Sequence, residues 1–200
     1  MTSIKTPNDL DTFDKLYTHL LTLPPPLLPP GHSYNPKLTS TVASLELHPT
    51  LEAALHLLNH DLPSAHFLVR HMQAPPAYEG MLLHGILHRI EGDYDNARAW
   101  CRDVAKCGDD GVFHKVWKSK EQALEFIDKV ERLKKRKEGS KEGLEGESKR
   151  ELEAVVEFCV ERFGVGRVGD AREAWKQPEE DERKKVGQNM IVGGEGWREF

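Results

Sequence analysis

Two histidines one helical turn apart are the residues of this chain whose type and spacing best suit chemistry. His84 and His88 lie four positions apart within an apolar stretch over residues 78–104. At this spacing on a helix, both imidazoles reach one point beside the helix and can bind a transition metal there. Glu91 follows three positions after His88 and can add a carboxylate. The pattern therefore indicates a site for a divalent metal such as zinc.

An earlier part of the chain carries the same histidine spacing. His56 and His60 are also four positions apart, and Glu52 precedes His56 by four. Helix bundles close metal sites with histidine and carboxylate ligands from facing helices. His56 is therefore the fourth candidate ligand, beside His84, His88 and Glu91.

Two other interpretations of these histidines remain open. In the first, they pack between helices and their ring nitrogens bond to backbone or carboxyl groups; in the second, they form a metal-free acid–base site. If they only pack, Arg89 pairs with a carboxylate and Asp93 caps the following helix. Trp100 then belongs to the core. Arg89, Asp93 and Trp100 complete the candidate functional cluster, in which the sequence assigns no catalytic role.

The elements that must position these side chains are predicted to be helices. Apolar residues recur at intervals of three and four, with Asp or Asn before several segments and Gly or Pro after them. The sequence predicts an all-α fold, and within residues 63–72 the spacing predicts that Ala65, Phe67, Leu68 and Met72 are buried. The expected helices are residues 8–23, 49–58, 63–72, 77–91, 94–107, 121–133 and 149–163, with shorter turns at 39–47 and 170–175.

Composition divides the chain into one domain, a loop and a tail. Residues 1–133 and 149–176 are expected to form a single helical domain. Residues 134–148 are charged and carry glycines, which predicts a flexible loop because such a segment buries little apolar surface. Residues 177–200 are predicted to be a polar C-terminal tail.

Two successive helix pairs in this pattern look like one unit repeated. A shift of 32 residues aligns small residues with small residues and aspartate with aspartate: Ala53 with Gly85, Asp61 with Asp93, and Ala65 with Ala97. Small residues at such points let paired helices approach closely.

With Gly92-Asp93-Tyr94 at the turn, residues 46–109 resemble the tetratricopeptide family. They depart from it by having His84 or Glu52 where the family has a large apolar residue. The resemblance implies paired antiparallel helices. The stretch LHGILHRIEGDYDNARAW (residues 83–100) also resembles a family of uncharacterised helical proteins.

Bulk properties restrict the function further. The net charge is −5 and the pI about 6.1, which gives no general attraction to nucleic acid. No apolar run is long enough for a membrane helix. Three cysteines without metal-site spacing suit a reducing compartment, and the N-terminal residues lack signal-peptide features. We expect a cytoplasmic protein, with a nuclear location also compatible.

Two functions follow from these observations. The first is a non-enzymatic interaction or scaffold module that needs no cofactor and engages a protein partner. The alternative is a metal-binding protein or metal-dependent enzyme that uses the histidine and carboxylate residues named above.

Overall fold

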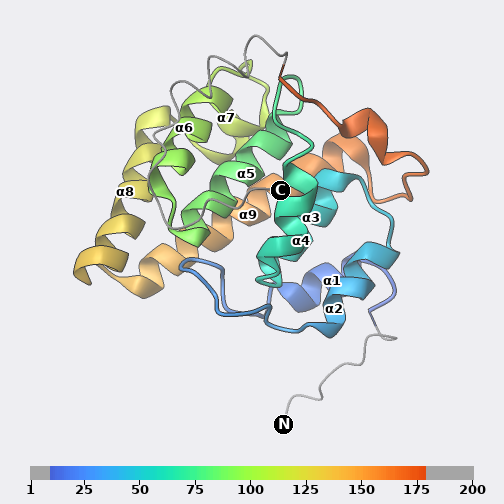
Figure 1. Ribbon diagram of the computed structural model, residues 1–200, viewed down its shortest axis with the longest axis horizontal. Coiled ribbons are helices and arrows are strands. Elements are labelled where there is room, and N and C mark those ends of the chain that lie inside the picture. Colours follow the sequence, from blue (N-terminus) through green and yellow to red (C-terminus); the bar gives the residue numbers. More distant parts are fainter. Residues whose placement is uncertain (1–9, 179–200) are drawn as a thin grey trace.

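The computed structural model describes residues 10–178, and this part of the chain is all-α, as the periodicity predicts. Figure 1 shows its helices packed around one another. They are α1 (Phe13–Leu20), α2 (Lys37–Ser44), α3 (Pro49–Leu58), α4 (Leu62–Val69), α5 (Tyr78–Glu91), α6 (Tyr94–Val104), α7 (Val112–Val116), α8 (Lys120–Arg136) and α9 (Lys141–Phe163), followed by a 3₁₀ turn, η2 (Ala171–Ala174).

The central helices pack in chain order. α3 contacts α4, which contacts α5; α5 packs on α6, and α6 on α8. We call α3 and α4 the first helix pair, and α5 and α6 the second. The long helix α9 runs behind this series and contacts α3, α7 and α8 (Figure 1). The fold therefore places α4 and α5, from different pairs, directly against each other.

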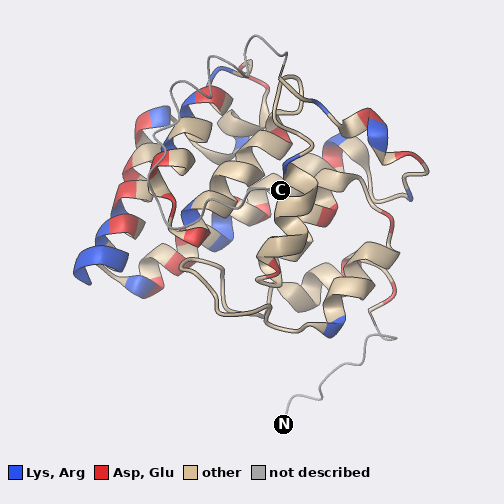
Figure 2. Cartoon of the chain, viewed as in Figure 1, with Lys and Arg blue, Asp and Glu red and all other residues tan. Residues whose placement is uncertain are grey.

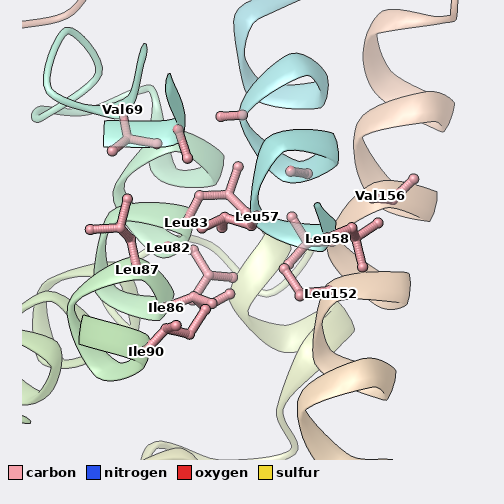
Figure 3. Packing of buried hydrophobic residues seen from close by; sticks show 14 of the residues in the cluster. Leu57, Leu58, Val69, Leu82, Leu83, Ile86, Leu87, Ile90, Leu152 and Val156 are labelled. Atoms are coloured by element: carbon pink, nitrogen blue, oxygen red, sulfur yellow. The ribbon is translucent and has the colours of Figure 1, made fainter. Parts of the chain in front are cut away.

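The core lies where the helix pairs meet α9. Figure 3 shows Leu57 of α3 close to Leu83 of α5, and Leu58 of α3 beside Leu152 and Val156 of α9. All five side chains are buried. Burying a leucine or valine fully contributes roughly 1.5–3 kcal/mol, so this region fixes α5 relative to α3 and α9.

The two helix pairs begin their second helices in the same way. Asp61 accepts a hydrogen bond from the Ser64 amide at the start of α4, and Asp93 accepts one from the Asn96 amide at the start of α6, each at 3.3 Å. These caps satisfy amides that have no partner inside the helix. Gly92 ends α5 with a φ of +93°, a left-handed conformation that favours glycine. Both caps and the turn agree with the sequence prediction.

The charged segment over residues 134–148 is more ordered than its composition predicts. α8 continues to Arg136 and α9 begins at Lys141, so only residues 137–140 lie outside helices. Ser140 caps α9 by accepting from the Gly143 amide at 3.2 Å. Leu144 and Ser148 are buried. The predicted flexible loop is therefore corrected: contacts with the rest of the fold order a segment whose own composition does not.

A second correction concerns Phe67. Its side chain is 54% exposed, although the spacing predicts burial. α4 instead turns Ala65 and Val69 toward the core, and Met72 beyond its end is buried as predicted. Phe67 lies under the guanidinium of Arg70, which sits 4.8 Å from the ring centroid.

The segment before α2 runs across several helices without forming one. We call residues 24–30 the strap. The His60 ring donates to the Pro24 carbonyl at 2.8 Å, and the Ser148 hydroxyl donates to the Pro26 carbonyl at 2.6 Å. Two prolines thus fasten the strap to the turn of the first pair and to α9.

Charge and apolarity are distributed unevenly over the helices. Figure 2 shows charged residues concentrated on α8 and parts of α9, whereas α3 and α4 carry few. Among the described residues, no helix combines the length and apolarity needed to cross a membrane. Of the predicted C-terminal tail, residues 179–200 lie outside the described part of the chain, as do residues 8 and 9 of the first predicted helix.

Candidate metal centre

Three histidines come together where α4 packs against α5. His66 of α4 and His84 and His88 of α5 each offer a ring nitrogen, and these atoms lie within 4.8 Å of one another. The His84 and His88 rings stack with centroids 4.8 Å apart, and the His66 ring meets them edge-on at 5.2 and 5.8 Å. We call these residues the histidine cluster. Nitrogens bound to one tetrahedral zinc lie about 3.4 Å apart, so small side-chain rotations would bring the cluster to that geometry.

The second helix pair holds His84 firmly. The Trp100 ring of α6 stacks on the His84 ring with centroids 4.6 Å apart and a 25° interplanar angle. This contact depends on Gly85, because a Cβ at that position would lie 2.9 Å from the Trp100 Cβ. Glycine therefore allows α6 to approach α5 closely enough for Trp100 to cover one side of the cluster.

Burial keeps these imidazoles neutral. Burial first, and then the adjacent His88 and His66, lower the pKa of His84 to about 2. Burial also lowers the pKa of His88 to about 4, with Asp93 acting in the opposite direction, and burial followed by the charge of Arg70 lowers the pKa of His66. Neutral imidazole is the form that binds metals.

Two nitrogens of the cluster have unused bonding capacity. The Nδ1 atoms of His84 and His88 are buried and have no hydrogen-bond partner among the described residues. An unsatisfied buried polar atom costs about 1–3 kcal/mol. Histidines that only pack between helices usually bond these atoms to backbone or carboxyl groups. The Nδ1 of His56 also has no hydrogen bond, but it lies 3.2 Å from an Asp61 oxygen.

Two carboxylates lie near the cluster. Glu91 places one oxygen 3.6 Å from the His88 Nδ1 and the other 4.0 Å from the His66 Nδ1. Asp93 places an oxygen 3.8 Å from the His88 Nδ1. These distances exceed those of hydrogen bonds. Glu91 therefore lies close to two of the three histidines, as the spacing on α5 predicts.

The structure places His56 elsewhere, which corrects its assignment as a ligand beside His84 and His88. The His56 Nδ1 lies 3.2 Å from an Asp61 oxygen, and its Nε2 lies 3.7 Å from a Glu52 oxygen. His56 is thus enclosed by carboxylates of the first helix pair. It lies on α3 and is not among the three histidines that converge between α4 and α5.

The three residues proposed to complete the functional cluster separate as well. Asp93 and Trp100 lie beside the histidines, but Arg89 points elsewhere from α5. Its guanidinium donates to the Glu151 carboxylate at 2.5 Å and to the Ser148 hydroxyl at 3.2 Å. Arg89 is 1% exposed and is the buried partner of a carboxylate, as the packing interpretation predicts.

Sequence reasoning did not find His66. It stands alone on α4, with no second histidine or carboxylate at helical spacing that would mark it. The only available signal was the order of packing, since consecutive helix pairs place the second helix of one against the first helix of the next.

No protein-family model, curated protein or solved structure matches this chain. The chemistry open to the histidine cluster follows from its geometry. Three imidazoles with a carboxylate nearby suit zinc and neighbouring divalent transition metals.

Proposed function

We propose that this protein binds one divalent transition metal, such as zinc, through His66, His84 and His88. The observation that carries the proposal is the convergence of three neutral imidazoles, two of which have buried Nδ1 atoms without a hydrogen-bond partner. A metal ion accepts lone pairs from all three rings at once. It also joins α4 to α5, and so links the two helix pairs.

A bound metal would stabilise the fold. Binding to the folded chain alone stabilises it by RT ln(1 + [M]/Kd), about 2.7 kcal/mol when free metal is 100 times the Kd. The rings lose little conformational freedom on binding, because Trp100 and the packing of α4 on α5 already restrict the cluster.

The test is elemental analysis and metal titration of the full chain, purified without a histidine tag. We expect one metal per chain, a rise in Tm with added Zn²⁺, and absorption bands of tetrahedral geometry with Co²⁺. Binding of Co²⁺, whose d shell is open, should also quench the fluorescence of Trp100, which stacks on His84.

Matched variants locate the site. His66→Gln should weaken Zn²⁺ binding by more than about 100-fold, because losing a ligand exceeds the 10–100-fold cost of disturbing a ligand's partner. The side chain of His66 is 40% exposed, so this change should leave the fold intact. His56→Gln, in the first helix pair, should leave binding unchanged. A chain that carries no metal and melts identically with and without chelator would refute the proposal.

A second candidate function is that of an interaction module for a protein partner. The observation that favours it is an exposed aromatic surface at the end of α4: Phe67 is 54% exposed and Trp175 is 43% exposed. His71 lies between them, 4.9 Å from the Trp175 ring and 5.5 Å from the Phe67 ring. Aromatic residues are enriched at the energetic centres of protein interfaces.

Affinity capture from cell extract, comparing the wild-type chain with Phe67→Ser and Trp175→Ser, tests this second function. A specific partner should be retained by the wild type and lost from both variants, in the presence and absence of chelator. Capture of the same proteins by all three chains would count against this surface.

A further inference from the structure

We infer that the region where α8 ends and α9 begins is a docking surface for an acidic polypeptide segment that carries one large apolar side chain. We call residues 129–141 the basic tip; they comprise the end of α8, the short connection and the first residue of α9. The acidic groups of the partner lie on the basic tip, and its apolar side chain enters the cavity beside it. This surface shares no residue with the histidine cluster or the aromatic surface, so the inference does not depend on the proposed metal.

The first argument is an excess of positive charge. The basic tip holds seven lysine and arginine residues and two glutamates, whereas the whole chain has a net charge of −5. Figure 2 shows basic residues gathered where α8 ends. Three of the seven pair with glutamates four positions away. The side chains of the other four have no ion-pair or hydrogen-bond partner among the described residues: Arg132, Lys134, Arg136 and Lys137.

The second argument is that the basic tip costs stability in the free protein. Positive charge near the end of a helix is favourable for its dipole, but Arg132 and Arg136 lie four positions apart, a spacing at which like charges destabilise a helix. Lys137 ends α8 with a φ of +61°, in the left-handed region where glycine is usual. A partner that supplies carboxylates removes the repulsion between these cations.

The third argument is a cavity that opens beside the basic tip. It has a volume of about 580 Å³, which lies within the usual range of ligand pockets. Arg132, Gly139 and Ser140 of the basic tip form one part of its wall. Phe126 of α8 and Leu144 of α9 contribute apolar groups to the wall. An apolar side chain of a partner bound at the basic tip can therefore enter this cavity.

The charges around the cavity suit an apolar side chain better than a carboxylate. Of the acids in its wall, Glu147 accepts from Arg150 at 2.8 Å and Glu125 pairs with Lys129 at 2.9 Å. The remaining acid among the described lining residues, Glu138, repels a carboxylate. The acids of the partner therefore lie on the basic tip. An apolar anchor in a pocket with polar groups around it is a common arrangement at protein interfaces.

Two other anionic partners fit this surface less well. Nucleic acid that is single-stranded binds through exposed aromatic rings on which its bases stack, but the aromatic side chains that line the cavity, Trp117 and Phe126, are only 2% and 4% exposed. Binding to a membrane interface uses exposed apolar side chains. The large ones among the described residues all lie outside the basic tip: Tyr34, Phe67, Val165 and Trp175.

The experiment is fluorescence polarisation with the full chain and a labelled probe, a short peptide of aspartate and glutamate with one central phenylalanine. A companion peptide carries serine at the centre. We expect saturable binding of the phenylalanine peptide, at least about 10-fold tighter than that of the serine peptide, because a buried phenylalanine contributes at least this factor. Added salt should weaken both, and chelator should change neither.

Charge variants separate binding from folding. Arg132→Gln combined with Arg136→Gln removes two unpaired cations and should weaken peptide binding by about 5-fold or more. The Tm of this variant should be unchanged or higher, because the repulsion within α8 is removed. The control, Lys106→Gln combined with Arg172→Gln, removes the same charge from exposed positions outside the basic tip and should leave binding unchanged.

A further variant fills the cavity. Gly143 lies in its wall, and a Cβ at this position would meet only the Ser140 side chain, at 3.5 Å. Gly143→Leu should therefore fold, with a Tm at least as high as that of the wild type, because glycine disfavours the helix. It should weaken binding of the phenylalanine peptide by about 10-fold and leave the serine peptide unaffected.

Each result decides the inference. Weaker binding by the charge and cavity variants, with Tm retained, supports it. Equal binding of the two peptides, or binding that Gly143→Leu does not change, would mean that the surface attracts polyanions through charge alone, and would overturn it. Tighter binding to phosphatidylserine vesicles or to a single-stranded oligonucleotide than to the phenylalanine peptide would overturn it too. A wild-type chain that binds neither peptide refutes this inference whatever its metal content, and leaves the proposed metal site standing.

Discussion

The two helix pairs differ in the surroundings of two equivalent histidines, which the 32-residue shift relates. His56 of α3 and His88 of α5 occupy equivalent positions, and the aspartate that caps the following helix, Asp61 or Asp93, lies near each of them. Glu52 and Asp61 flank His56, whereas His84 stands where Glu52 would be. The exchange of Glu52 for His84 therefore accounts for one histidine of the cluster, and His66 of α4 supplies another.

The second helix of each pair also contacts the next helix through different kinds of residue. His66 on α4 and Arg98 on α6 are also 32 residues apart. His66 meets the histidines of α5, while Arg98 forms ion pairs with Asp128 and Glu131 of α8. The same position therefore provides a candidate ligand in one pair and a salt-bridge network in the other.

The largest expected effect comes from making α5 resemble α3 at a buried position. Leu57 and Arg89 are equivalent and both fully buried, but Arg89 neutralises Glu151. Arg89→Leu should lower the free energy of unfolding by about 3–5 kcal/mol, because it leaves a buried carboxylate unpaired. Urea unfolding monitored by circular dichroism measures this.

The double variant Arg89→Leu with Glu151→Leu serves as the control and should recover most of the loss, since replacing both partners of a buried ion pair with apolar residues is often neutral. A single variant as stable as the wild type would mean that Glu151 does not depend on Arg89.

A smaller effect on stability is expected where the two helices of each pair approach each other most closely. Ala53 and Gly85 are equivalent, yet only Gly85 lies against a side chain that leaves no room for a Cβ. Gly85→Ala should destabilise the fold by about 1–3 kcal/mol through overpacking against Trp100. Ala53→Gly should cost about 1 kcal/mol, from lost helix propensity. A Gly85→Ala chain with a higher Tm than the wild type would show that α6 does not approach α5 this closely.

The two helix caps should differ in strength. Asp93→Ala should cost about 0.5–2 kcal/mol, the usual value of an N-cap. Asp61→Ala should cost more, because the Asp61 side chain is 9% exposed against 46% for Asp93, and it accepts from the Thr39 hydroxyl of another helix at 2.6 Å. Chemical denaturation of both variants gives the comparison, and equal losses would mean that these additional contacts contribute nothing.

The smallest predicted effect is a dependence on acid. Burial raises the pKa of Asp61, but hydrogen bonds from Thr39 and Ser64 outweigh it, so this pKa lies below its usual value. The folded state then holds the proton less tightly than the unfolded state. Asp61 therefore contributes stability above about pH 4, and this is lost as the pH falls through the lowered pKa.

Wild type should accordingly lose more stability than Asp61→Asn between pH 5 and pH 2. Urea midpoints at the two pH values check this, and parallel losses in the two chains would refute it.

Local chemistry was predictable from the sequence, and convergence between distant segments was not. Asp61 and Asp93 cap helices, and Gly92 ends one, through contacts within one helical turn of their own positions. Their residue types and spacing were therefore sufficient to predict these roles. The pairing of Arg89 with a carboxylate was foreseeable, but its partner Glu151 lies 62 positions away. His66 joined the cluster only through the packing of α4 on α5.

Burial was predictable only where the neighbours of a helix were known. Phe67 fits an apolar stripe yet faces solvent, because α4 turns Ala65 and Val69 inward. Leu144 lies in a charged, glycine-bearing segment yet is buried. Periodicity marks a face as apolar, and only the fold decides which face is covered.

The strap has a consequence for the order in which the chain folds. Ser148 binds the Pro26 carbonyl across 122 residues, and Lys149 binds the Leu21 carbonyl across 128. During synthesis the helix pairs can assemble while α9 has yet to emerge from the ribosome, but the strap cannot be fastened to it. Contacts of such long range form late and slow the final step. The strap thus precedes the helix pairs in the chain, yet its bond to α9 is among the last to form.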